Sequence, residues 1–162
     1  MRDSRVLIDT SVWIAFFKNI DNHLVERVED TLRFADVHVP KVVVAELIQG
    51  AKSETEISVI EEFLEAFNII DQTDNTWLNA GRLSFSMKRK GITVNIVDCY
   101  IAILANENKC RIFTLDGHFK DIKKELEQKE KELGEESFIQ VCKFVGLKVI
   151  DTLWQEHLSY ME

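Results

Sequence analysis

The sequence predicts an α/β fold: a three-layer sandwich in which a short central parallel β-sheet of about five strands is flanked by helices. Short apolar segments that end in polar residues alternate with longer segments whose apolar residues recur every three or four positions. This alternation is typical of strands and helices that follow one another. The first apolar segment, 6–8, contains no polar residue. Strands of this kind are covered on both faces, which indicates a parallel sheet.

A single domain over residues 1–162 is the expected organisation. A chain of 162 residues is long enough for one full hydrophobic core and too short for two. No apolar run reaches the roughly 18 residues of a membrane span, and the first residues do not resemble a signal peptide. We therefore expect a cytoplasmic protein without membrane association. The cysteines, Cys99, Cys110 and Cys142, are too widely spaced for a zinc site or a redox pair, and we expect them in the core.

The elements follow from the apolar spacing along the chain. Helices are predicted near residues 13–20, 24–32, 41–50, 53–67 and 71–90 and from Val97 onward, and strands at 6–8, 36–40, 68–70 and 111–115. In the helix at 71–90 the inward residues are expected to be Trp77, Ala80, Ser84 and Met87. Beyond Phe119 the pattern predicts a charged helix at about 120–136, a final strand within 145–150 and a helix at about 151–161.

Carboxylates stand at the ends of two predicted strands. Asp9 follows the first strand and Asp116 follows the strand before the charged helix, and each has hydroxyl residues beside it. Because the carboxyl ends of parallel strands meet at one edge of a sheet, both acids are expected where α/β proteins bind ligands. Two more acids lie in apolar surroundings: Glu46 on a short apolar helix and Asp98 in the first turn of a later one. Taken singly, each has a simpler explanation as a helix cap or a half-exposed side chain.

Convergence of these four carboxylates would require compensating cations. Two carboxylates about 4 Å apart repel by roughly 4 kcal/mol at an effective dielectric constant of 20. Oxygen ligands without His or Cys select Mg²⁺ or Mn²⁺ over zinc, and one or two such ions with open coordination positions suit phosphoryl chemistry. The hydroxyls of Thr10, Ser11 and Thr114 are expected to orient the carboxylates or bound waters.

Four motifs carry a resemblance to a known family. In chain order they are Leu7-Ile8-Asp9-Thr10-Ser11, Val44-Ala45-Glu46-Leu47 followed by Gly50, Val97-Asp98-Cys99-Tyr100-Ile101-Ala102, and Thr114-Leu115-Asp116-Gly117-His118-Phe119. Together they resemble the PIN-domain ribonucleases and, within that family, the VapC-type toxins of toxin–antitoxin pairs. The resemblance runs from about Val6 to Phe119, and the segment 145–150 looks like the last strand of the family.

This resemblance implies a metal-dependent endoribonuclease that uses Mg²⁺ or Mn²⁺ to cut transfer, ribosomal or messenger RNA. It also implies that a small antitoxin protein silences the enzyme and that the protein forms a homodimer. Matched motif by motif, the acidic quartet of the family falls on Asp9, Glu46, Asp98 and Asp116, which implies that these residues bind the metal and carry the catalysis. Thr114 and Ser11 match hydroxyl positions of the same motifs.

The chain departs from the family pattern after Phe119. The charged helix at about 120–136 looks like an insertion before the final strand, and the helix at about 151–161 extends beyond a minimal family member. These additions could cover the site, enlarge a dimer surface or dock the antitoxin. The alternative for the charged helix is an extra solvated helix without such a role.

The net charge of −8 argues at first against a nucleic-acid partner. Residues 121–136 alone carry a net charge of −3, which leaves −5 on the rest of the chain, and two divalent ions would neutralise most of that. A local group of cations precedes the loop that leads to Asp98: Arg82, Lys88, Arg89 and Lys90. These four side chains could contact RNA phosphates, although the last three would equally stabilise the negative end of their helix.

Three other functions fit parts of the sequence. Asp9-Thr10-Ser11 has the form of the active-site triplet of aspartic proteases, but those enzymes need a paired aspartate in an all-β setting. A phosphatase of the haloacid-dehalogenase type needs a second Asp where Ser11 stands. The remaining alternative is a PIN-like module that binds RNA or protein without catalysis, which would be favoured if one of the four acids pointed into solvent.

Overall fold

In the computed structural model, residues 4–141 are described, and they form four strands and seven helices. The strands are β1 (Arg5–Ile8), β2 (Asp36–Pro40), β3 (Asn68–Ile70) and β4 (Arg111–Phe113). The helices are α1 (Thr10–Phe17), α2 (Asn22–Phe34), α3 (Lys41–Gln49), α4 (Glu54–Leu64), α5 (Thr76–Arg89), α6 (Ile96–Glu107) and α7 (His118–Val141). The α/β class and the order of elements are therefore confirmed.

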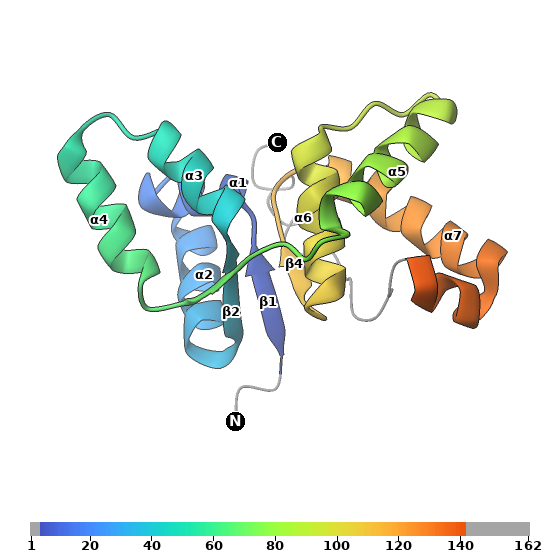
Figure 1. Cartoon of the computed structure of the whole chain (residues 1–162). Helices are drawn as coiled ribbons and strands as arrows, with labels where there is room; N and C mark the ends of the chain where they lie inside the picture. The colour runs from blue at the N-terminus through green and yellow to red at the C-terminus, as the bar shows by residue number, and fades with distance from the viewer. Residues whose placement is uncertain (1–3, 142–162) are drawn as a thin grey trace.

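The four strands form one parallel sheet in the order β3-β2-β1-β4. Helices α1 to α4 lie on one side of this sheet and α5 to α7 on the other, which gives the three expected layers (Figure 1). The described strands are one fewer than the five expected, because the predicted strand within 145–150 lies outside the described residues, as does the predicted helix at 151–161. The chain moves outward from β1 in one direction to β2 and β3 and returns to the other side at β4, so β1 and β4 flank the point where the strand order reverses.

The core surrounds β1 and α6. Val6, Leu7 and Ile8 are buried, as predicted for a strand covered on both faces. Helix α6 is buried from Cys99 to Asn106, since it lies between the sheet and α5 and α7. Cys99 and Cys110 are buried free thiols, as expected, whereas Cys142 lies outside the described residues. None of the helices described between residues 4 and 141 is long and apolar enough to span a membrane.

Helices α1 and α4 are joined by an aromatic cluster. Trp13 of α1 is fully buried, and its ring lies 5.7 Å from that of Phe63 on α4 and 5.8 Å from that of Phe67. Phe17 contacts Phe63 edge-on at 5.4 Å. Such ring pairs add to the free energy gained by burying apolar area, and they hold α4 against the helix that follows Asp9.

The helix predicted at 71–90 begins only at Thr76. In the preceding turn the hydroxyl of Thr76 accepts a hydrogen bond from the backbone N–H of Thr73, and this local bonding competes with helix formation. Ala80, Ser84 and Met87 are buried as predicted, but Trp77 is 44% exposed. The indole of Trp77 stacks on the ring of Tyr100 at 4.2 Å instead of entering the core.

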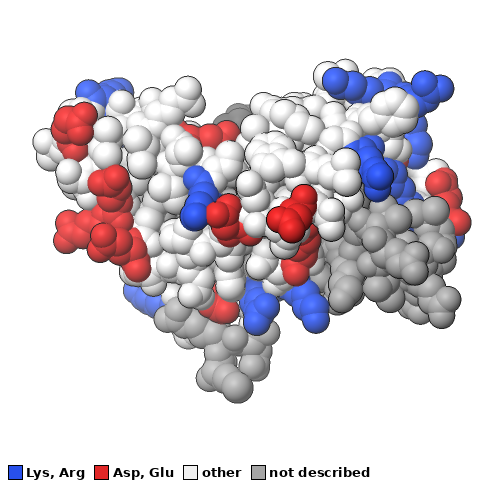
Figure 2. Space-filling model, in the orientation of Figure 1, with Lys and Arg blue, Asp and Glu red and all other residues white. Residues whose placement is uncertain are grey.

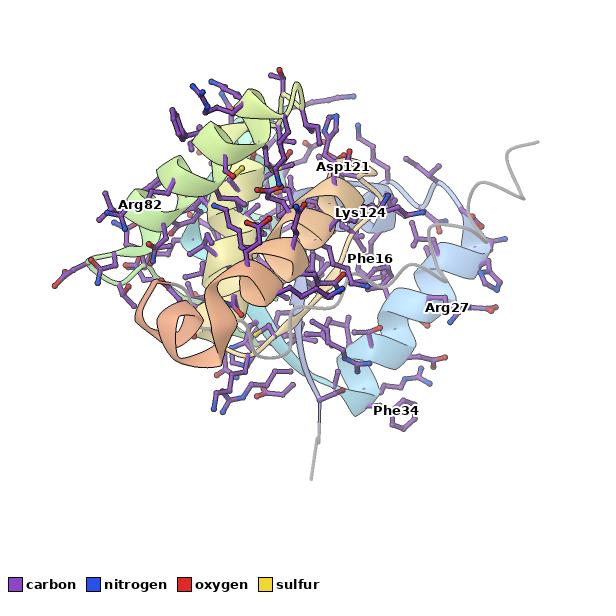
Figure 3. The ribbon with its side chains drawn as sticks, turned by 90° about the vertical axis from the view of Figure 1, so that its right-hand side faces the viewer. Phe16, Arg27, Phe34, Arg82, Asp121 and Lys124 are labelled. Atoms are coloured by element: carbon purple, nitrogen blue, oxygen red, sulfur yellow. The ribbon has the colours of Figure 1, made fainter. Side chains whose placement is uncertain are left out.

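The charged helix is α7, and its first half packs against α5 and α6 (Figure 3). Phe119, Ile122 and Leu126 are buried on this side, while Lys124 is exposed. Glu125 is buried with them, accepts a hydrogen bond from Ser86 (2.6 Å) and forms an ion pair with Lys90 (2.7 Å). The start of the charged helix is thus part of the packed domain.

Candidate active site

Asp9 lies at the carboxyl end of β1 and continues the sheet. Its backbone N–H donates to the carbonyl of Phe113 at the end of β4 (2.9 Å), which brings the two strand ends together. The Asp9 side chain is only 5% exposed. It occupies the N-cap position of α1.

Two hydroxyls hold the Asp9 carboxylate. Ser11 Oγ and Thr114 Oγ1 both donate to Asp9 Oδ2, at 2.8 and 2.9 Å. The same hydroxyls accept backbone N–H groups from the segment after β4, namely those of Leu115 (3.1 Å) and Asp116 (3.0 Å). Burial raises the pKa of Asp9, and the two hydroxyl bonds oppose this rise. The predicted orienting role of Ser11 and Thr114 therefore agrees with their contacts.

Glu46 is joined to the start of α1. It is half-buried on α3, and Thr10 Oγ1 donates to its Oε2 at 2.5 Å. The three hydroxyl residues proposed from the sequence thus each contact an acid of the quartet, Thr10 through Glu46 and the other two through Asp9.

Asp98 lies in the first turn of α6, whose N-cap Asn95 accepts the backbone N–H of Val97. The pKa of Asp98 is raised to about 7, because of burial first and then because of the charges of Asp116, Asp9 and Glu46, with His118 acting in the opposite direction. The ionisation of Asp98 therefore depends on the charges of the other three acids. Asp98 and Asp116 are close enough to share an ion, and the charges of Asp9 and Glu46 reach Asp98. Asp9 is buried and the other three acids are half-buried, so none of the four points fully into solvent.

His118 belongs to this site although the sequence prediction left it out. It follows Asp116 by two residues at the start of α7, and its Nδ1 lies 3.2 Å from Asp116 Oδ1. Asp98, Asp116 and His118 each offer one ligand atom, and these atoms all lie within 4.8 Å of one another. A histidine two residues after a strand-end acid was the only sequence signal for this contact.

The donor set fits a hard divalent cation. Burial and, after it, the charges of the neighbouring acids raise the pKa of Asp98, and a bound cation would favour its charged form. The donors are carboxylate oxygens with one imidazole nitrogen, a combination that accepts Mg²⁺ or Mn²⁺. Both described cysteines are buried thiols, and burial raises the pKa of Cys99 to about 11 and that of Cys110 to about 12, so neither supplies a thiolate.

A groove adjoins the site on the side of α1, α3 and α4. Its volume is about 430 Å³. Apolar side chains such as Ile14, Leu47 and Val59 line it, Lys18 is among its polar residues, and Glu46 forms part of its wall. The groove therefore opens directly beside one acid of the quartet.

The cations expected to contact RNA are not equivalent. Arg82, Lys88 and Arg89 are exposed on α5, and the guanidinium of Arg89 lies 5.7 Å from the centre of the exposed ring of Phe85. Arg82 extends from α5 away from the rest of the protein in Figure 3. Lys90 differs, because its ammonium group binds Glu125 and Gln128 on α7.

These features define an α/β sandwich whose acidic cluster lies where the order of the parallel strands reverses. Proteins of this class bind their ligands at the carboxyl edge of the sheet. The chain belongs to the PIN-domain family: the sequence model of the PIN domain matches residues 6–125. This match includes all four acids and the first turns of α7.

Relatives and solved structures of this family are similar to the chain. The tRNA(fMet)-specific endonuclease VapC of Salmonella typhimurium is 26% identical over 102 residues, which cover 60% of this chain and 76% of that protein. VapBC2 from Rickettsia felis, solved with a promoter DNA fragment, gives a TM-score of 0.63 at 21% identity and covers 72% of this chain and 92% of that chain. DNA-bound VapBC from Salmonella typhimurium gives a TM-score of 0.60 at 22% identity, with 90% of this chain and 96% of that chain covered.

Proposed function

We propose that this protein is a divalent-metal-dependent endoribonuclease and the toxin of a toxin–antitoxin pair. The observation that carries the proposal is the pair Asp98 and Asp116, whose ligand atoms lie within 4.8 Å of each other, next to strand-end Asp9 and with the charges of Asp9 and Glu46 acting on Asp98. The similarity to an endonuclease that acts on transfer RNA supports RNA as the substrate. An RNA substrate is consistent with action in the cytoplasm.

The residues of the site divide into those that hold the cations and those that hold the carboxylates. The quartet would hold one or two Mg²⁺ or Mn²⁺ ions. Such ions activate water and neutralise charge on a phosphate. Thr10, Ser11 and Thr114 keep Glu46 and Asp9 in place by the hydrogen bonds described above. Fixed carboxylates spare the enzyme reorganisation during the reaction.

The reaction adds water across a phosphodiester bond. The attacking water forms a new P–O bond and loses a proton, the bond to the leaving oxygen breaks, and that oxygen gains a proton. Asp9 Oδ1 is not engaged by either of the two hydroxyls that hold Oδ2, so this oxygen faces no competition from them for a cation or a water.

Substitution of the strand-end acids tests the catalytic role. Asp9→Asn and Asp116→Asn keep the size of the side chain and remove its charge, so both variants are expected to lose RNA cleavage while their circular dichroism spectra stay unchanged. Cleavage by the wild type is expected to stop with EDTA and to return with Mg²⁺ or Mn²⁺. Undiminished cleavage by either variant, or cleavage that persists in EDTA, would refute the proposal.

RNA capture is proposed for the exposed cations of α5. Figure 2 shows Lys and Arg gathered over the end of α5, whereas Asp and Glu gather over α4 on the opposite side of the molecule. We assign phosphate contacts to Arg82, Lys88 and Arg89, and we omit Lys90 because binding a phosphate would break its pair with buried Glu125. Arg82→Gln with Arg89→Gln is expected to weaken RNA binding and to flatten its salt dependence. An unchanged salt dependence would exclude this surface.

The antitoxin is proposed to bind the apolar groove beside Glu46. Similar chains have been solved as VapBC complexes. A segment in this groove would lie against an acid of the quartet, which gives a direct way to block the site. The homodimer expected from the resemblance stays a prediction, and light scattering on the full-length protein measures it.

A further inference from the structure

His118 is the one nitrogen donor in a group of three described residues, with Asp98 and Asp116, whose ligand atoms lie close together. It stands at the first residue of α7, 57% exposed, with its ring against Asp116. The backbone N–H of His118 donates to Asp116 Oδ1 (2.9 Å), and the next residue, Phe119, is buried in the core. These contacts fix the backbone of His118, and its ring lies against Asp116.

The distances suit a shared cation. Ligands at about 2.1–2.2 Å from a six-coordinate ion are about 3 Å apart when adjacent and about 4.4 Å apart when opposite. His118 Nδ1 and Asp116 Oδ1 are 3.2 Å apart, close to the adjacent spacing. With Asp98 included, the three ligand atoms lie within 4.8 Å of one another, so small side-chain rotations would allow all three to contact one ion.

We propose that His118 is a nitrogen ligand of this cation site and gives the site a preference for Mn²⁺ over Mg²⁺. The inference rests on the proposed function only in that the acidic quartet binds a divalent ion. Mg²⁺ binds oxygen ligands almost exclusively, whereas Mn²⁺ lies among the transition metals that also accept imidazole. A site of carboxylates alone would bind Mn²⁺ and Mg²⁺ with similar affinity. One imidazole ligand would raise the affinity for Mn²⁺ relative to that for Mg²⁺.

A second role for the same contact must be distinguished. The imidazole N–H could simply donate to Asp116 Oδ1 and position that carboxylate without touching an ion. Asparagine at position 118 retains an N–H donor, and it can contact an ion only through its carbonyl oxygen, because an amide nitrogen is not a metal ligand. His118→Asn therefore keeps the hydrogen bond and removes the nitrogen ligand, while His118→Ala removes both.

The experiment uses metal-free full-length protein loaded with Mn²⁺ and examined by pulsed electron paramagnetic resonance. The wild type is expected to show the coupling of a directly bound imidazole ¹⁴N, and both His118→Asn and His118→Ala are expected to lose it. In calorimetric titrations His118→Ala should lose about tenfold or more of the Mn²⁺ affinity and less than about threefold of the Mg²⁺ affinity. His23→Gln, a substitution at a histidine of α2, is the control and should retain the nitrogen coupling.

The outcomes separate this inference from the proposed function. Bound Mn²⁺ without nitrogen coupling in the wild type, or wild-type Mn²⁺ affinity in His118→Ala, would overturn the ligand role and leave the ribonuclease proposal untouched. Absence of Mn²⁺ binding would overturn it as well. Conversely, nitrogen coupling in a protein that cleaves no RNA would refute the proposed activity and leave the role of His118 in place.

Discussion

Asp98→Asn is expected to stabilise the metal-free protein. In the folded chain the pKa of Asp98 is about 7, against 3.8 for an ordinary aspartate, because burial and the neighbouring acids disfavour its charge. Below pH 3.8 the carboxyl is neutral in both the folded and unfolded states, and the folded state carries no penalty. As the pH rises toward 7 the unfolded state ionises first, so stability is lost across this window and stays low above it. Asparagine does not ionise and avoids this loss.

The structure sets the size of the effect. A rise from 3.8 to about 7 corresponds to about 4 kcal/mol of unfolding free energy at about 1.4 kcal/mol for each pKa unit. Asp98 is only half-buried, so solvent screening reduces the expected gain to about 2 kcal/mol at pH 8. At pH 4.5 the gain should be much smaller, since little of the ionisation window has been crossed.

Urea unfolding in EDTA at pH 4.5, 6 and 8 measures this gain. Asp71→Asn is the matched control, because Asp71 is paired with Lys41, its pKa is lowered and its replacement gives no such gain. Saturating Mn²⁺ should raise the stability of the wild type more than that of Asp98→Asn, since the ion offsets the same repulsion. If Asp98→Asn is no more stable than the wild type at pH 8 without metal, the argument that burial and the neighbouring acids disfavour the charge of Asp98 in the folded state is refuted.

Three further predictions concern other contacts of the described chain. Thr114→Val removes a buried hydroxyl that donates to Asp9 and accepts from the backbone N–H of Asp116. It should reduce cleavage by about 10–100-fold, and Thr114→Ser should recover it. Normal activity in the valine variant would contradict the orienting role of the hydroxyl. Lys90→Met leaves Glu125 buried without its cation and should lower the urea-unfolding free energy by about 2 kcal/mol, a loss that the double variant with Glu125→Leu should largely reverse; equal losses in both would contradict it. Val59→Glu places a charge in the groove and should weaken antitoxin binding at least tenfold in calorimetry while leaving cleavage intact. Phe34→Glu, on an exposed residue at the end of α2, should change neither antitoxin binding nor cleavage. Equal weakening of binding by both variants would show that the antitoxin does not bind in the groove.

Sequence reasoning located the strand-end acids because their placement depends on local patterns alone. An apolar run that ends in a carboxylate identifies a strand and its end, and parallel strands share an edge, so Asp9 and Asp116 could be paired without knowing any contact. Asp98 followed from helical spacing in the same way. Glu46 was expected near the core because it is the only acid of an apolar helix, and its bond to Thr10 is consistent with its half-buried position.

Other features depend on how distant elements pack, and no local pattern reports that. Lys90 was read as a surface cation, but α7 brings Glu125 to it from 35 residues away. Trp77 has the apolar character of a core residue, yet α5 begins at Thr76 and presents the indole to Tyr100 at the surface of the core. The place of His118 in the site could not be predicted, because its contact with Asp116 arises from a turn whose geometry no sequence pattern reports.

The hydroxyl pair at Asp9 has a mechanical consequence for the segment that follows β4. The backbone N–H groups of Leu115 and Asp116 lie outside any strand or helix, yet each donates to a hydroxyl that is itself bound to the Asp9 carboxylate. Side chains therefore extend the connection between β1 and β4 beyond the last backbone bond of the sheet. Opening this segment breaks the support of Asp9 and displaces Asp116 in the same event. The amides of Leu115 and Asp116 should consequently exchange with solvent as slowly as those of the sheet, and the two strand-end acids should move as one body.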